Sequence, residues 1–250
     1  MEILLPLFQY PGGFMSNLIK KVTLDNLSNH LKDKELIKTL TPNYTIGCKR
    51  ILISDEYYST LNNEKVKITD IPIKRITKNS IIREDNVEWN VDAIIYATGF
   101  KATEFLVPLK IVGLKGKDLH KSWGNCASAY LGITVPEFPN FFITYGPNTN
   151  TGSISIIFLI ECQVKYIVNC IKAVSKNKLR YLNLRGEALE KWNEECQNKL
   201  KSTVWVRDCH SWYKTADGTI ATMWPYGSLY YWYRTSRVKL SDYHKVGKVY

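Results

Sequence analysis

Two apolar runs along the chain each lead directly into a turn of small residues. The first run, residues 91–96, is followed by Ala97-Thr98-Gly99-Phe100, and the second, residues 141–145, is followed by the turn 146–152. The first run is apolar apart from Asp92, which is typical of a central parallel strand buried on both faces. Small-residue turns let bare backbone approach a flat, phosphate-linked ligand at the ends of such strands. The pattern predicts a sheet that binds a dinucleotide-type cofactor.

Shorter elements are predicted ahead of the first run. Apolar positions recur at helical spacing between Leu18 and Leu40, which indicates one or two short helices. A strand-rich section follows, because β-branched runs alternate there with Asn, Asp and Pro, the residues that favour turns. These runs are residues 51–53, 66–68, 71–76 and 80–82, with tight turns expected at Asn62-Asn63 and Lys78-Asn79.

A long helix is predicted to begin after Gly152. Apolar residues three and four apart form one stripe along it. The stripe consists of Ile157, Ile160, Val164, Ile167, Ile171 and Val174. With Ser153 or Ser155 as its cap, free backbone N–H groups near the turn would face a phosphate or an electronegative ring edge. A plain strand–turn–helix crossover without a ligand is the alternative. A linker-like segment, residues 175–186, precedes a further helix over residues 187–200.

The composition is that of an ordinary globular chain, with 45% hydrophobic and 23% charged residues among 250. The formal charge is +11, but basic residues are spread from Lys20 to Lys248 without a long run. This spread favours a solvated surface over nucleic-acid binding. The most apolar stretch, residues 154–162, is too short to span a bilayer. Aromatic residues crowd the C-terminal part, where they indicate a packed wall.

The cysteines and histidines predict no metal site. The six cysteines are Cys48, Cys126, Cys162, Cys170, Cys196 and Cys209. They show neither CxxC spacing nor a histidine at metal-ligand spacing. Isolated thiols in a chain of this size are typical of small buried hydrophobes in a reducing, cytoplasmic compartment. The four histidines show no partner pattern and are expected to be structural.

Further sequence blocks accompany the two turns in a fixed order. Upstream, residues 40–50 end in Gly47-Cys48-Lys49-Arg50, and residues 54–58 read Ser-Asp-Glu-Tyr-Tyr. Downstream come Trp-Gly at 123–124, Ala-Tyr-Leu-Gly at 129–132, Val-Pro-Glu-Phe-Pro-Asn-Phe at 135–141, Cys-His-Ser-Trp-Tyr at 209–213, Gly218, and Trp-Pro at 224–225. Together these blocks resemble the C-terminal half of the class B flavin-dependent monooxygenases, the group that holds the Baeyer–Villiger and flavin-containing monooxygenases.

The resemblance covers roughly the second half of such an enzyme. The two GxGxxG fingerprints of the family and its F-x-G-x-x-x-H motif are absent from this sequence. The implied fold is α/β, a partial FAD/NAD(P)-binding, Rossmann-like architecture of a two-dinucleotide-binding-domain flavoprotein. Residues 1–96 then correspond to the C-terminal remnant of the NADPH-binding domain. Residues 97–250 correspond to the C-terminal part of the FAD-binding domain with an aromatic-rich tail.

The resemblance also implies a reaction, and the Baeyer–Villiger branch is the nearer of the two. In the family, NADPH reduces FAD, the reduced flavin takes up O2, and a C4a-peroxyflavin inserts one oxygen atom into a small ketone, aldehyde or soft heteroatom. The expected cofactors are therefore FAD and NADPH. The expected partners are the substrate, O2 and a missing N-terminal half, with no nucleic acid and no transmembrane segment.

Arg50 and Lys49 are the residues that the resemblance places nearest to the chemistry. Arg50 matches the arginine that stabilises the peroxyflavin anion, a role that suits a guanidinium because it stays charged at any working pH. Lys49 matches the lysine that reads the 2′-phosphate of NADPH. A solvated surface pair is the alternative for this dipeptide.

Two turns complete the predicted site. Asn148, Thr151, Gly152 and Ser153 match the turn along the pyrimidine edge of the isoalloxazine ring. Thr98 and Gly99 match the turn at which the nicotinamide domain returns to the flavin domain.

Two other functions stay open at this point. A non-catalytic remnant or interaction module would keep the shape of half the enzyme, and the absent Gly-rich loops favour it. A basic nucleic-acid-binding adaptor is the weaker alternative. The presence of Lys49, Arg50 and the turn 146–152 favours the enzyme.

Overall fold

The computed structural model describes residues 11–152, 154–206 and 211–248. The chain divides into two compact units. Unit 1 comprises Met1–Asn17, Tyr44–Ile51 and Lys101–Tyr250, and unit 2 comprises Leu18–Asn43 and Leu52–Phe100. The assignment of residues 1–96 and 97–250 to the two nucleotide-binding domains stays a prediction.

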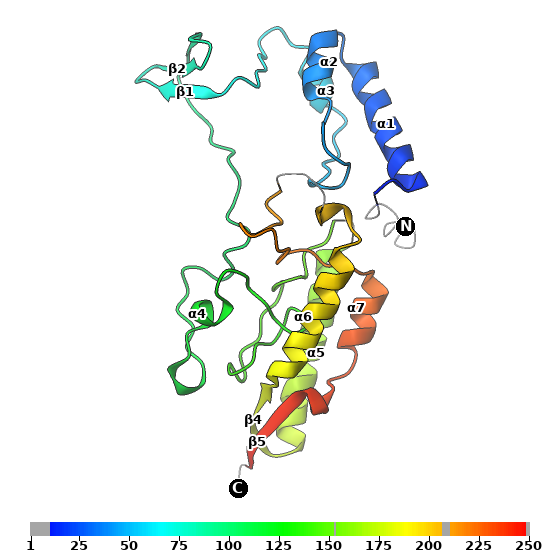
Figure 1. The fold of residues 1–250 in the computed structure, drawn as a ribbon, viewed down its shortest axis with the longest axis vertical. Helices are drawn as coiled ribbons and strands as arrows, with labels where there is room; N and C mark the ends of the chain where they lie inside the picture. Colours follow the sequence, from blue (N-terminus) through cyan, green and yellow to red (C-terminus); the bar gives the residue numbers. More distant parts are fainter. Residues whose placement is uncertain (1–10, 153, 207–210, 249–250) are drawn as a thin grey trace. The chain divides into compact units, whose positions relative to one another are not determined.

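Unit 1 is built on three longer helices and a two-stranded antiparallel ribbon. The helices are α5 (Ile156–Lys176), α6 (Gly186–Leu200) and α7 (Ser228–Thr235), preceded by the short helix α4 (Leu119–Trp123). Strand β4 (Leu179–Leu184) pairs with β5 (Tyr243–Lys248) in the register Leu184↔Tyr243. Single 3-10 turns occupy Leu114–Gly116, Val204–Val206 and Leu240–Asp242. Figure 1 shows α5 and α7 side by side.

Helix α5 forms for the reasons that its sequence indicates, but it buries a different face from the one expected. Ser155 is the N-cap, and its hydroxyl oxygen accepts a hydrogen bond of 3.3 Å from the backbone N–H of Phe158. The buried positions are Leu159, Cys162, Gln163, Tyr166 and Cys170. Ile157, Val164 and Ile171 of the predicted stripe are 71%, 46% and 56% exposed. The helix is apolar on more than one side, so periodicity alone did not select the face that packs.

The aromatic residues of the C-terminal part form the centre of the largest core cluster, as the packed-wall prediction requires. Trp224 stacks on Trp192 of α6 with ring centroids 5.9 Å apart, and meets Tyr231 of α7 edge-on at 4.8 Å. All three side chains are buried. Pairs of this geometry stabilise a core beyond their buried area, by about 0.5–1.5 kcal/mol each.

Unit 2 carries short helices and one small antiparallel sheet. Its helices are α2 (Lys34–Leu40), α3 (Tyr57–Thr60) and most of α1 (Phe14–His30), which confirms the helices expected between Leu18 and Leu40. The sheet has the order β1-β2-β3, formed by Ile73–Ile76, Ser80–Arg83 and Glu88–Asn90. The turn predicted at Lys78-Asn79 joins β1 to β2.

Several predicted strands are not formed. Residues 91–96 and 141–145 belong to no strand, and neither do residues 51–53 and 66–68. Ile95 and Phe100 are 91% and 95% exposed, where a central strand would bury them. A strand is held by the ladders on either side of it, and the described residues provide no such neighbour for residues 91–96. The supposed linker 175–186 was also wrong, because it contains β4, whose partner β5 lies far along the chain.

Cysteine chemistry differs from the prediction at one position. Cys126, Cys162, Cys170 and Cys196 are free, and the last three are buried as expected. Cys48 is fully buried and takes part in a disulfide, so the expectation of isolated thiols was wrong for this residue. Sequence spacing did not indicate it, since disulfide pairing depends on proximity in the fold. No helix in the described ranges is long and apolar enough to cross a membrane.

Candidate functional site

The turn 146–152 is anchored to the segment 220–224 of unit 1. The side-chain amide of Asn148 donates to the carbonyl oxygens of Ile220 and Met223 at 2.8 and 3.1 Å. The backbone N–H of Asn148 donates to Ala221 at 2.8 Å. Asn148 is buried and has a positive φ of 55°, a conformation that asparagine tolerates better than most residues. Its side-chain nitrogen and its backbone N–H therefore fix the turn, and of the backbone groups of Asn148 only the carbonyl oxygen remains for a ligand.

Hydrogen bonding and close packing also fix the rest of the turn. The hydroxyl of Thr151 donates to the carbonyl oxygen of Ile154 at 2.5 Å, at the approach to α5. Gly146 packs against backbone: a Cβ there would lie 2.3 Å from the carbonyl oxygen of Gly132, so only glycine fits. Gly152 is exposed, with its Cα side facing Trp205. Ser153, the fourth predicted residue of this turn, lies outside the described residues.

Arg50 lies close to the entrance of this turn. Burial raises the pKa of Tyr145, the residue before Gly146, and the positive charge of Arg50 opposes that shift. The same holds for the pKa of Tyr213, which burial raises and Arg50 lowers. Arg50 itself is exposed and makes no hydrogen bond or ion pair with the described part of the chain. The structure thus brings together Arg50 and the turn 146–152, two sites predicted from separate blocks.

Lys49 lies beside Arg50 but has a different environment. Its ammonium group sits over the ring of Tyr44, 4.5 Å from the ring centroid. A cation–π contact at an exposed position stabilises by about 0.5–1 kcal/mol and leaves the ammonium free to meet a further anion. Cys48 precedes the pair, and its burial in a disulfide anchors this stretch in unit 1.

A buried glutamine connects the turn to the helical core. Gln163 of α5 is fully buried, and its side-chain oxygen accepts a 2.9 Å hydrogen bond from the backbone N–H of Tyr145. Its amide nitrogen donates to the hydroxyl of Tyr231 at 2.8 Å, and that hydroxyl donates to Leu131 at 2.7 Å. The phenol of Tyr145 in turn donates to Asn150 at 2.9 Å. Because these side chains are hydrogen-bonded to one another and to the backbone, the network holds Tyr145 in one place.

Sequence reasoning missed Tyr145, Gln163 and Tyr213. A lone glutamine among the apolar residues of α5 was the available signal for Gln163, since a polar side chain there needs partners. No local signal existed for Tyr145, which has a positive φ of 56° that its residue type disfavours.

Two of the predicted site residues, Thr98 and Gly99, lie in unit 2. Thr98 and Gly99 are exposed, and Gly99 has a φ of +92°, a conformation that glycine adopts without strain. They belong to unit 2, whereas Arg50 and the turn 146–152 belong to unit 1. Their role at the return between domains stays a prediction.

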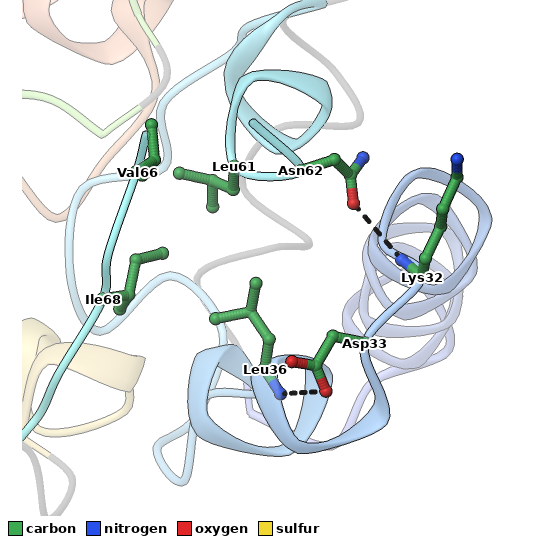
Figure 2. A pocket seen from close by; sticks show the side chains of 7 residues that line it. All are labelled: Lys32, Asp33, Leu36, Leu61, Asn62, Val66 and Ile68. Atoms are coloured by element: carbon green, nitrogen blue, oxygen red, sulfur yellow. Dashed lines mark hydrogen bonds between the residues drawn. The ribbon is translucent and has the colours of Figure 1, made fainter. Parts of the chain in front are cut away.

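Unit 2 also contains a depression of about 360 Å³, shown in Figure 2. Its apolar side chains, Leu36, Leu61, Val66 and Ile68, face one another across the gap. Asp33 accepts hydrogen bonds from the first turn of α2, and Asn62 bonds to the backbone of His30 and Lys32. Asp33 and Asn62 are thus engaged in holding helix ends, so the depression does not bring together polar side chains that could bind a ligand or act in a reaction.

Two of the histidines expected to be structural, His30 and His120, contact backbone carbonyl oxygens. His210 lies outside the described residues.

Comparison with curated proteins identifies relatives over nearly the whole chain. The FAD-binding monooxygenase ktnD of Aspergillus niger is 40% identical over 239 residues, which is 93% of this chain and 39% of that protein. A Baeyer–Villiger monooxygenase of Pseudomonas aeruginosa is 36% identical over 229 residues, 91% of this chain and 44% of that protein. The chain thus spans less than half the length of these relatives. No family model matches.

Solved structures show the same fold. A steroid monooxygenase bound to NADP superposes with a TM-score of 0.84 at 25% identity, over 96% of this chain and 47% of that one. Cyclohexanone monooxygenase from Rhodococcus sp. Phi1 bound to NADP+ gives a TM-score of 0.85 at 22% identity, over 96% and 46%. These neighbours confirm the expected α/β fold class, since they share the architecture. Over nearly its whole length the chain is therefore similar in sequence and in fold to FAD-binding and Baeyer–Villiger monooxygenases, and it spans less than half of their length.

Proposed function

We propose that the chain forms the flavin-edge part of an FAD- and NADPH-dependent monooxygenase that inserts one oxygen atom from O2 into a small organic substrate. The observation that carries this proposal is that Arg50 belongs to the same compact unit as the turn 146–152 and is near enough for its charge to act on Tyr145, the residue before the turn. A charged guanidinium that forms no ion pair with the described residues suits a ring edge on which negative charge develops. The relatives named as FAD-binding and Baeyer–Villiger monooxygenases support the same reaction class.

The residues present fit one half of the cofactor. The turn 146–152 is rigid, and its exposed Gly152 has no side chain to keep a planar ring away. The ADP half of FAD requires a Gly-rich loop at a helix N-terminus, and the sequence contains no GxGxxG. The chain is therefore suited to hold the isoalloxazine edge, while another polypeptide region holds the pyrophosphate.

Each predicted residue then has a distinct task. Bound FAD and NADPH supply the electron transfer and the activation of O2. Arg50 stabilises the negative charge that develops on oxygen, and Lys49 meets the 2′-phosphate of NADPH as a point charge. The carbonyl oxygen of Asn148 and the backbone of Gly152 contact the pyrimidine edge, and Thr151 fixes the approach to α5. Thr98 and Gly99 form the return between the two nucleotide-binding domains.

A complementing polypeptide is the second part of the proposal. We define the complement as a polypeptide with the two GxGxxG fingerprints, corresponding to the portion of the relatives that this chain does not span. Exposed apolar side chains on α5 support its existence, because a helix with apolar residues on several sides is normally covered. The segment 91–100, with Ile95 and Phe100 almost fully exposed, offers further apolar side chains to the same complement.

A non-catalytic interaction module is the second candidate, favoured by those same exposed apolar residues and by the missing Gly-rich loops. It predicts binding to a complement without turnover. Both candidates therefore predict that the chain binds the complement, but only the enzyme predicts formation of product.

The experiment is a complementation assay. The chain is co-expressed with a complement taken from a relative, and NADPH oxidation and oxygenated product are measured on ketone, aldehyde and sulfide substrates. We expect product formation, and Arg50→Ala should lower it about 100-fold to 1000-fold while NADPH continues to reduce the flavin. Lys49→Ala should instead weaken the preference for NADPH over NADH.

Two controls make the outcome decisive. Arg180→Gln removes an exposed cation from β4, outside α5, and should change neither measurement. A stable complex that binds FAD but gives no product with any substrate would support the interaction module. Product formation by Arg50→Ala at the wild-type rate would remove Arg50 from the site.

A further inference from the structure

A cleft of about 740 Å³ lies in unit 1, away from the turn 146–152 and from the segment of Arg50. Its walls come from α6, from α7 and from the chain that follows α7. The lining includes Lys191, Glu195, Trp232, Tyr233, Arg237 and Asp242. Small-molecule sites in proteins are typically about 300–1000 Å³, so this cleft has the size of such a site.

The charge of the cleft is positive after its internal pairs are formed. Glu195 accepts from Arg234 at 3.0 Å and from Tyr230 at 2.7 Å. Asp242 is paired with Lys239 at 3.0 Å and accepts a hydrogen bond from Tyr130 at 2.8 Å. Both carboxylates of the lining are therefore engaged.

Two cations of the lining are left over. Lys191 and Arg237 are exposed and form no ion pair with the residues that the structure describes. They give the cleft two uncompensated positive charges, which favour an anionic ligand.

Aromatic side chains give the cleft apolar, planar faces in addition to its positive charge. The guanidinium of Arg234 lies over Trp192, 4.8 Å from the ring centroid, so this inner part of the wall is already filled. Trp232 and Tyr233 are 49% and 69% exposed. Large exposed aromatic side chains at a cleft mark binding surfaces more often than packing, because they are rigid and amphipathic.

We propose that this cleft binds a small planar aromatic anion, with its ring against Trp232 and Tyr233 and its charged group at Lys191 and Arg237. The charge and the walls together limit the ligand: the two cations favour an anion, and the exposed aromatic faces favour a planar ring. The inference is independent of the proposed flavin chemistry, because it uses none of the same residues.

The test is a titration of the 250-residue chain by calorimetry and by tryptophan fluorescence. The probes are 2-naphthoate, its neutral isostere 2-naphthamide, and acetate, which carries the charge without the ring. A parallel titration with 2-naphthyl phosphate distinguishes carboxylate from phosphate as the anionic group. We expect 2-naphthoate or 2-naphthyl phosphate to bind about tenfold or more tightly than the amide and acetate.

Matched variants locate the site. Arg237→Gln and Trp232→Ala should each weaken the binding of the aromatic anion by about tenfold. Arg180→Gln removes an equally charged, exposed arginine from β4 and should have no effect. Equal affinity for 2-naphthoate, 2-naphthyl phosphate and 2-naphthamide, or unchanged affinity in both variants, overturns the proposal. Loss of probe binding when the complement is added also overturns it, since the cleft would then be an interface between polypeptides.

Discussion

The exposed stripe on α5 leads to the sharpest prediction about the isolated chain. We define the stripe as Ile157, Val164, Val168 and Ile171, which are 71%, 46%, 40% and 56% exposed. Their exposed parts together equal about two aliphatic side chains, and burying each such side chain contributes roughly 1.5–3 kcal/mol. Covering the stripe should therefore contribute roughly 3–6 kcal/mol to association with a second chain or with the complement. We expect the isolated chain to self-associate in a concentration-dependent manner.

The double variant Ile157→Gln/Ile171→Gln tests this value. It removes somewhat more than one side-chain equivalent, or roughly 2–4 kcal/mol, which corresponds to about 30-fold to 1000-fold weaker association. Glutamine is at least as good a helix former as isoleucine, so α5 itself should be retained. Sedimentation velocity over a concentration series gives the dissociation constant, and circular dichroism checks the helix content.

Leu229→Gln provides the matched control. Leu229 is 70% exposed on α7, as exposed as Ile157, but it does not belong to the stripe. It should leave association almost unchanged. A wild-type chain that is a monodisperse monomer at all concentrations would refute the reasoning, and so would a double variant that associates as strongly as the wild type.

Three further predictions concern the retention of FAD, the hydrogen bonds of Tyr231 and the dependence of stability on pH. The isolated chain should lose FAD on dialysis, because the missing pyrophosphate loop removes several charge-assisted hydrogen bonds of roughly 1.5–3 kcal/mol each; a stoichiometric, retained flavin spectrum would contradict this. In the soluble double variant, Tyr231→Phe should lower the free energy of unfolding by about 2–4 kcal/mol, because it leaves Gln163 and Leu131 without their partner, whereas Tyr233→Phe at an exposed site should cost less than about 0.5 kcal/mol in urea titrations. Burial raises the pKa values of Tyr166, Tyr231 and Tyr243 above their unfolded value of about 10, so stability should be complete below pH 10 and fall as pH rises beyond it; a flat urea midpoint from about pH 8 to 11 would disprove the assignment.

The sequence by itself carried the family resemblance, several of the local elements and the choice of candidate residues. A serine cap at 153 or 155, of which the structure uses Ser155, the helix α6 and the turn at Lys78-Asn79 follow from signals that act within a few residues. The order of the motif blocks carried the resemblance, and the relatives confirm it. These features are local or linear, so the order of the amino acids is enough to specify them.

Only the tertiary structure decided which surfaces meet. Residues 91–96 have the composition of a central strand but form none, because a strand depends on neighbours that lie elsewhere. Helix α5 buries Leu159 and Tyr166 and exposes Ile157, a choice that apolar residues on more than one of its sides did not encode. The approach of Arg50 to Tyr145 and the bonds of Gln163 depend on segments far apart in sequence. Contacts of that kind follow from packing of the whole unit, so no local pattern predicts them.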